Sequence, residues 1–93
     1  MTYEVVLTAD AAEDLLEITF GRIETAIAAL ARYSARGAPP RELLALGIRE
    51  FRETFFKPYR IIYRIDGKRV YVSLIADGRR DMQALLARRL LGA

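Results

Sequence analysis

Two alternating runs of residues, joined by an Asp66-Gly67 pair, constrain the fold of this chain more than any other feature. Residues 59–65 and 69–76 both place apolar side chains at every second position, as a strand with one buried face does. An Asp-Gly pair favours the positive backbone angles of a two-residue hairpin turn. The sequence therefore predicts an antiparallel hairpin with Asp66 and Gly67 as its loop.

The register of this hairpin sorts the side chains onto two faces. One face is wholly apolar and is expected to pack on helices; it comprises Tyr59, Ile61, Tyr63, Val70, Val72 and Leu74. The other face is half basic and half apolar; it comprises Arg60, Ile62, Arg64, Arg69, Tyr71 and Ser73. A further strand at residues 48–56 turns back at Lys57-Pro58, so we predict a three-stranded antiparallel meander with Arg60 opposite Ser73.

Helical patterns lie on both sides of the meander. Residues 2–7 alternate as a first strand, and Thr8 is a good N-cap for a helix that begins near Ala9. A short amphipathic helix follows the meander; its apolar face holds Met82, Leu85, Leu86 and Leu90. The predicted class is α+β, with an N-terminal strand and helical segment packed on the meander. Residues 1–93 are expected to form a single domain.

The helical segment loses its apolar periodicity halfway. One stripe ends at Ile18 and the next starts five residues later; the two stripes are Ala11, Leu15 and Ile18, then Ile23, Ile27 and Leu30. Residues 19–21, Thr-Phe-Gly, mark either a break or a drift in phase along one long helix. Gly37, before two prolines, is expected to end the segment as a left-handed cap. Residues 42–47 are expected to form a loop with a turn.

The residue inventory narrows the chemistry that is open to the chain. It contains no cysteine and no histidine, so thiolate and imidazole chemistry are excluded and catalysis would depend on Arg, Lys, Tyr, Asp or Glu. No cofactor loop or metal-ligand spacing is found, so we expect neither a cofactor nor a metal. No secretory signal and no apolar stretch of about 20 residues is found, so a cytoplasmic protein is expected.

Charge is distributed unevenly along the chain. Acidic residues crowd the first half; Glu13, Asp14 and Glu17 are expected to form a solvated helix face. Basic residues crowd the second half, and four of them should meet at one sheet edge: Lys57, Arg60, Arg79 and Arg80. Four neighbouring cations require compensation, either by an anionic ligand such as a phosphate backbone or by local acids such as Asp81 or Glu53.

Three segments resemble the RelE/ParE superfamily, the toxins of bacterial type II toxin–antitoxin systems. They are LTADAAEDLLEI at residues 7–18, FFKPYRIIYRI at residues 55–65 and IADGRRDMQ at residues 75–83. Together they span most of the chain in the family's order. The resemblance implies a small toxin that a cognate antitoxin neutralises.

The resemblance also bears on the activity. RelE-type members cleave mRNA on the ribosome with sheet lysines and arginines and a C-terminal Tyr or His. Arg60 and Arg80 match the family's arginines, but no Tyr or His follows Arg80, and Glu53, Thr54 and Phe55 replace the expected lysines. The chain is therefore more similar to ParE-type members, which poison DNA gyrase. The alternatives are an mRNA endonuclease, with Arg60, Arg80 and Tyr71 or Lys57 as its catalytic residues, and an inactive relative that binds only its antitoxin.

Two further expectations concern partners. An antitoxin segment is expected to bind exposed apolar residues of the mixed face and the C-terminal helix, namely Ile62, Tyr71, Ile75, Leu85, Leu86 and Leu90. The family's helical hairpin is shortened here, between Ile18 and Arg22. If the two helices fuse, the fused helix would project outward and favour exchange between protomers in a homo-oligomer.

Overall fold

A four-stranded sheet with helices on both faces organises the chain. The structure, a computed structural model, describes residues 2–18 and 22–92. In chain order the elements are β1 (Glu4–Leu7), α1 (Ala9–Leu16), α2 (Ile23–Tyr33), the 3-10 helix η1 (Ser34–Arg36), α3 (Arg41–Leu44), β2 (Phe51–Phe56), β3 (Tyr59–Asp66), β4 (Arg69–Asp77) and α4 (Met82–Leu91). The predicted α+β class and the meander are confirmed. No helix in the described ranges is both long enough and apolar enough to cross a bilayer.

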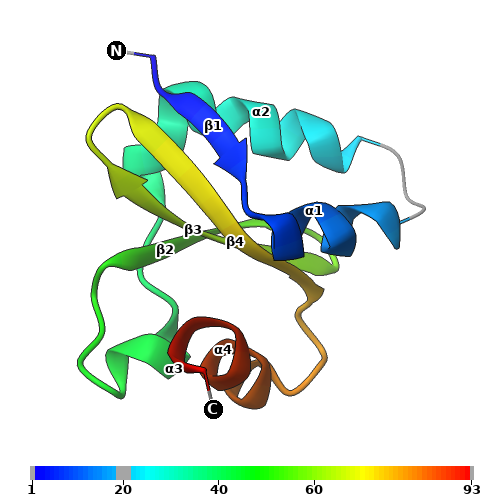
Figure 1. The fold of residues 1–93 in the computed structure, drawn as a ribbon, viewed down its shortest axis with the longest axis vertical. Coiled ribbons are helices and arrows are strands. Elements are labelled where there is room, and N and C mark those ends of the chain that lie inside the picture. The colour runs from blue at the N-terminus through cyan, green and yellow to red at the C-terminus, as the bar shows by residue number, and fades with distance from the viewer. Residues whose placement is uncertain (1, 19–21, 93) are drawn as a thin grey trace.

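The strands follow the order β1-β4-β3-β2. β2, β3 and β4 pair antiparallel, and β1 joins the far side of β4 in parallel. Figure 1 shows α1 and α2 on one face of the sheet and α3 and α4 on the other. The sheet is therefore buried on both faces, and each face has its own hydrophobic core.

The first core joins the two N-terminal helices to the sheet. Both predicted apolar stripes are confirmed, since Ala11, Ile23, Ile27 and Leu30 are buried there. The Thr8 Oγ1 accepts a hydrogen bond from the Ala11 N–H, which caps α1 as predicted.

The expectation that α1 and α2 form one fused helix is wrong. α1 ends at Leu16 and α2 begins at Ile23, directly after Arg22, whose φ of 88° is incompatible with a continuing helix. Residues 19–21, where either a break or a drift in phase is predicted, lie outside the described residues. Since both helices pack on one core, their apolar faces are covered within the chain. The reason for expecting exchange between protomers is thereby removed.

The hairpin loop is displaced by one residue from the prediction. Asp66 pairs with Arg69, so Gly67, with φ of 60°, and Lys68 form the two-residue loop. Arg64 consequently lies opposite Tyr71.

A β-bulge then changes which residues face each core. Tyr63 pairs with Val72 but Ile62 pairs with Leu74, so Ser73 is an extra residue in β4. Beyond it, Leu74 lies on the opposite face from the one predicted and joins the second core. The remaining members of the predicted apolar face do pack on the first core. Arg60 lies opposite Ala76, and its predicted pairing with Ser73 is wrong.

Gly37 is required for a reason that differs from the predicted one. Its φ of −66° lies outside the left-handed region, so the expected left-handed cap is wrong. A Cβ at this position would overlap the Tyr63 hydroxyl and lie 2.8 Å from the Glu53 carbonyl oxygen. The Tyr63 hydroxyl donates a 2.5 Å hydrogen bond to the Ser34 carbonyl. Glycine therefore allows the chain to approach the sheet closely.

The segment expected as a loop at residues 42–47 contains a helical turn instead. α3 occupies its first part, and Leu43 is buried in the second core beside Ile62. Burial of this leucine stabilises the turn.

We predict that Gly37→Ala and Tyr63→Phe are strongly coupled in stability. Gly37→Ala should lower the free energy of unfolding by about 1–3 kcal/mol because the new methyl group overlaps the tyrosine hydroxyl. Tyr63→Phe removes that hydroxyl, so the double variant should be more stable than the sum of the two single effects predicts. Urea unfolding of the four proteins measures the coupling, and strict additivity would contradict the steric explanation.

Candidate functional site

Arg60 of β3 lies between two glutamates that reach it from different elements. Its Nη1 and Nη2 atoms each donate a 2.8 Å hydrogen bond to one carboxylate oxygen of Glu42, from α3. Its Nε donates a 2.7 Å hydrogen bond to Glu53, on the neighbouring strand β2. All three side chains are nearly buried, with 10%, 14% and 11% of their surfaces exposed for Arg60, Glu42 and Glu53. Arg60 therefore forms a bidentate ion pair with Glu42 and a second ion pair with Glu53.

The cluster leaves no free positive charge at Arg60. Hydrogen bonds from Arg60 hold the pKa of Glu42 at about 2, well below its ordinary value of 4.5. The hydrogen bonds with Glu42 and Glu53 raise the pKa of the Arg60 guanidinium in turn, despite burial. The single positive charge of Arg60 is thus shared by the carboxylates of Glu42 and Glu53. Of the two forms of compensation expected for the basic residues, pairing with local acids holds for Arg60.

The other predicted cations do meet at one end of the sheet. The Gly78 N–H donates a 2.8 Å hydrogen bond to the Pro58 carbonyl, which joins the β2–β3 turn to the segment after β4. A Cβ on Gly78 would lie 3.0 Å from the Arg60 Cδ, so the arginine stem passes beneath this junction. Lys57, Arg79 and Arg80 are exposed around it. The backbone segments that carry these residues therefore meet as predicted, and the side chains of Lys57, Arg79 and Arg80 are exposed there.

Arg79 is partly neutralised by the residue that ends β4. Its Nη2 lies 2.6 Å from the Asp77 Oδ2, and its backbone N–H donates to the Asp77 Oδ1. These hydrogen bonds lower the pKa of Asp77 to about 2. Arg79 remains largely exposed to solvent, where such an ion pair contributes little stability. Its guanidinium is therefore available to exchange Asp77 for another anion.

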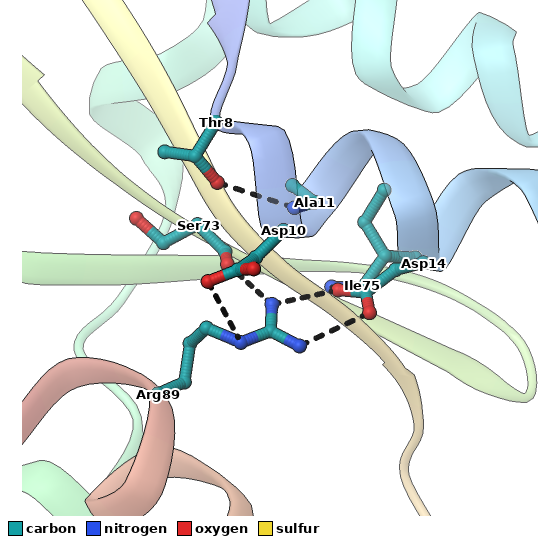
Figure 2. Close-up of polar contacts among 7 residues, drawn as sticks. All are labelled: Thr8, Asp10, Ala11, Asp14, Ser73, Ile75 and Arg89. Carbon is teal, nitrogen blue, oxygen red and sulfur yellow. Dashed lines mark hydrogen bonds and ion pairs between the residues drawn. The ribbon is translucent and has the colours of Figure 1, made fainter. Parts of the chain in front are cut away.

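A second ion-pair cluster, which the sequence did not predict, closes the edge of β4. β1 ends beside Val72, and further along β4 the Asp14 Oδ2 accepts a 3.0 Å hydrogen bond from the Ile75 N–H. Arg89 of α4 donates to both oxygens of Asp14, at 2.9 and 3.1 Å, and to the Ser73 carbonyl at 2.8 Å. Figure 2 shows Arg89 reaching α1 across the strand.

This cluster corrects the expectation for α1. Asp14 was expected on a solvated face, yet its side chain is mostly buried against Arg89. The hydrogen bonds with Asp14 raise the pKa of Arg89. The signal that sequence analysis missed is the spacing of Asp10 and Asp14, which places both carboxylates toward one guanidinium.

Several apolar residues expected to be exposed are buried. Ile62 and Ile75 are 0% and 4% exposed, and Leu86 is 1% exposed, because α3 and α4 cover one face of the sheet and α1 the other. Leu85 and Leu90 are only partly buried, at the margin of the second core. Tyr71 is half-buried, with the Arg64 guanidinium 4.8 Å above its ring. In the described ranges the exposed large apolar side chains are others: Leu16, Tyr33, Leu44, Leu46, Phe55 and Leu91.

We predict that Glu42 makes stability depend on pH below 4.5. Its folded pKa is depressed, so its contribution is present above pH 4.5 and is lost as the pH falls toward 2. A shift from 4.5 to about 2 corresponds to at most about 3 kcal/mol at 1.36 kcal/mol per pKa unit, and solvent screening lowers this contribution. Urea unfolding between pH 4.5 and 2 should show this slope in the wild-type chain and a reduced slope in Glu42→Gln. The exposed Glu50→Gln is the control, and equal slopes in all three would contradict the prediction.

The comparisons with known proteins agree with one another. Residues 5–82 match the family described as the ParE toxin of the type II toxin–antitoxin system parDE. The fold is similar to one chain of the crystal structure of the toxin–antitoxin complex RelBE2 from Mycobacterium tuberculosis. The TM-score is 0.64 and the identity 27%, over 83% of this chain and 99% of that one. No curated protein sequence matches the chain. The chain belongs to the ParE toxin family of type II toxin–antitoxin systems, within the RelE/ParE superfamily.

Proposed function

We propose that this toxin acts by binding and inhibiting DNA gyrase in the cytoplasm, and that a cognate antitoxin neutralises it. The observation that carries the proposal is the pairing of Arg60 with Glu42 and Glu53. An endonuclease of the RelE type needs a free cation on the sheet to stabilise the developing charge of a cleaved phosphodiester. Here the matching arginine is bound by two carboxylates. Arg60 is thus proposed to have a structural role.

The tyrosine that would assist such cleavage is also poorly placed. Tyr71 pairs with Arg64 near the β3–β4 loop, whereas Arg80 follows the opposite end of β4. The six residue-to-residue steps from Tyr71 to Asp77 span about 20 Å in a strand. Tyr71 and Arg80 therefore do not form one catalytic site, and Tyr71 is better explained by its contact with Arg64.

The remaining cations are suited to binding. Lys57, Arg79 and Arg80 are exposed at the end of the sheet, on backbone held by the Gly78–Pro58 hydrogen bond. Arginines on a rigid turn bind phosphates or carboxylates without the cost of ordering a loop. We therefore assign these three residues to contact with gyrase or its DNA.

The second candidate is a ribosome-dependent mRNA endonuclease. Its support is the 27% identity to a chain of the RelBE2 complex. In that case Arg80 would act as the cation, and Lys57 would be the remaining proton carrier near it.

A relative that only binds its antitoxin is the third candidate. Growth on expression of the chain distinguishes this third candidate from the other two.

We predict that Arg79→Ala with Arg80→Ala abolishes toxicity without unfolding the protein. Both side chains are exposed, so the melting temperature should change little. The matched control is Arg32→Ala with Arg49→Ala, which removes two other exposed arginines. The measurements are growth after induction and trapping of cleaved DNA by purified gyrase, and only the first pair should lose both effects.

The other outcomes assign the remaining candidates. Growth arrest with gyrase unaffected, together with mRNA cleavage on ribosomes that Arg80→Ala abolishes, would replace gyrase by the ribosome as target. Normal growth on expression of the wild-type chain would leave the antitoxin-binding relative.

A further inference from the structure

A hollow of about 400 Å³ opens on the face of the sheet that carries the Arg60 side chain. Three of its lining residues have apolar rings: Pro39, Phe55 and Pro58. Phe55 pairs with Arg60 across β2 and β3, so the two side chains lie on the same face of the sheet. The Phe55 side chain is 60% exposed, more than any other described aromatic residue. The hollow therefore presents an aromatic ring that no described part of the chain covers.

The same hollow has a polar part with its geometry already fixed. Arg60 and Glu53 both line it, and their charged atoms lie 2.7 Å apart. A carboxylate can accept about four hydrogen bonds. The hydrogen bond that the Arg60 Nε donates to the Glu53 Oε1 therefore leaves acceptor capacity on this carboxylate. A ligand that donates from an amino group could use this capacity without breaking the ion pair.

Basic side chains surround the hollow. Arg41 lines it, and Lys57 and Arg79 each adjoin a lining residue in the chain. All three are exposed. Arg41 and Lys57 form no salt bridge with the described residues, and Arg79 pairs with Asp77 at the surface. A ligand that combines a flat ring with anionic groups matches both the exposed ring and the uncompensated positive charge.

We propose that this hollow binds a nucleoside phosphate. The base stacks on Phe55, and an amino group of the base donates to the Glu53 carboxylate. The phosphate oxygens accept hydrogen bonds from Arg41 and Lys57. The volume lies within the range of small-molecule sites, which starts at about 300 Å³.

Two sources present this chemistry. One is a free nucleoside triphosphate, and the other is an unpaired nucleotide of a DNA strand. The second source rests on the proposed function, in which the chain acts on gyrase while DNA is cleaved. In that case Arg79 binds the phosphate of a neighbouring nucleotide.

Simpler ligands use only part of the hollow. Inorganic phosphate binds the cations but leaves the Phe55 ring in water. Duplex DNA offers phosphates as well, but its bases are stacked on one another and do not reach an aromatic side chain. A nucleotide that is free or unpaired satisfies the ring, the carboxylate and the cations together.

The test titrates the purified chain by calorimetry at low salt. The probes are ATP, a single-stranded pentanucleotide of deoxyadenosine, the same pentanucleotide in a duplex, and inorganic triphosphate. ATP and the single strand should both bind. Inorganic triphosphate, which lacks a base, should bind at least about fivefold more weakly than ATP.

Matched variants test the two parts of the site. Phe55→Ala should weaken ATP and the single strand about fivefold or more, whereas Phe55→Tyr keeps a stacking ring and should stay within about twofold. Arg41→Ala should weaken both probes. The controls are Leu46→Ala, at a leucine that is 54% exposed in the loop before β2, and Arg49→Ala, at another exposed arginine. Melting temperatures establish that all five variants fold.

The ratio between probes identifies the source. A single strand that binds about tenfold more tightly than both ATP and the duplex indicates a DNA strand, because its further phosphates reach additional cations. ATP that binds as tightly as the single strand indicates a free nucleotide.

Three results would overturn the proposal. They are no binding of ATP or the single strand, equal affinity for ATP and inorganic triphosphate, and wild-type affinity in Phe55→Ala. The first of these would leave the hollow to a polypeptide. The titrations contain no gyrase, so a chain that binds nucleotides but traps no cleaved DNA would contradict the proposed function alone.

Discussion

One extra residue in β4 determines how the two sides of this sheet are filled. The bulge at Ser73 reverses the facing of the residues after it, so Ile75 points to α1 and α2 while Leu74 points to α3 and α4. Both faces of the strand thereby become apolar where helices cover them. The bulge also leaves the Ser73 carbonyl to Arg89, which ties α4 to Asp14 of α1. Packing and edge closure thus depend on the same irregularity.

The two ion-pair clusters have different consequences for function. Arg89 connects helices from opposite faces, and its role is architectural (Figure 2). Arg60 occupies a position where the superfamily resemblance implies a cation for catalysis, but Glu42 and Glu53 surround it. Replacing a lysine by an acid beside such an arginine converts a reactive charge into a buried ion pair. The proposed inhibition through a binding surface does not need a free cation at this position.

The two edges of the sheet differ in how their backbone groups are hydrogen-bonded. The β1 side of the sheet is short, and beyond it Asp14 and Arg89 take up the exposed groups of β4. The β2 edge is covered by Ala38 at a single position and is open beside it, where Phe55 is exposed. Open strand edges promote association, so soluble proteins usually block them. Among the described residues, the β2 edge beside Phe55 lacks such a block.

Local patterns were sufficient to infer the meander, the cap at Thr8, the apolar stripes of α1 and α2, and the superfamily, because each depends on neighbours in the chain. The bulge at Ser73 was not predictable, since alternation in β4 continues through it and only the contacts with both helix layers select the shift. The pairing of Arg60 with Glu42 was equally hidden, because residues 18 positions apart meet only when α3 packs on the sheet. Burial of Ile62 and exposure of Phe55 follow from the same packing, since a strand's alternation identifies two faces but not which of them a distant helix will cover.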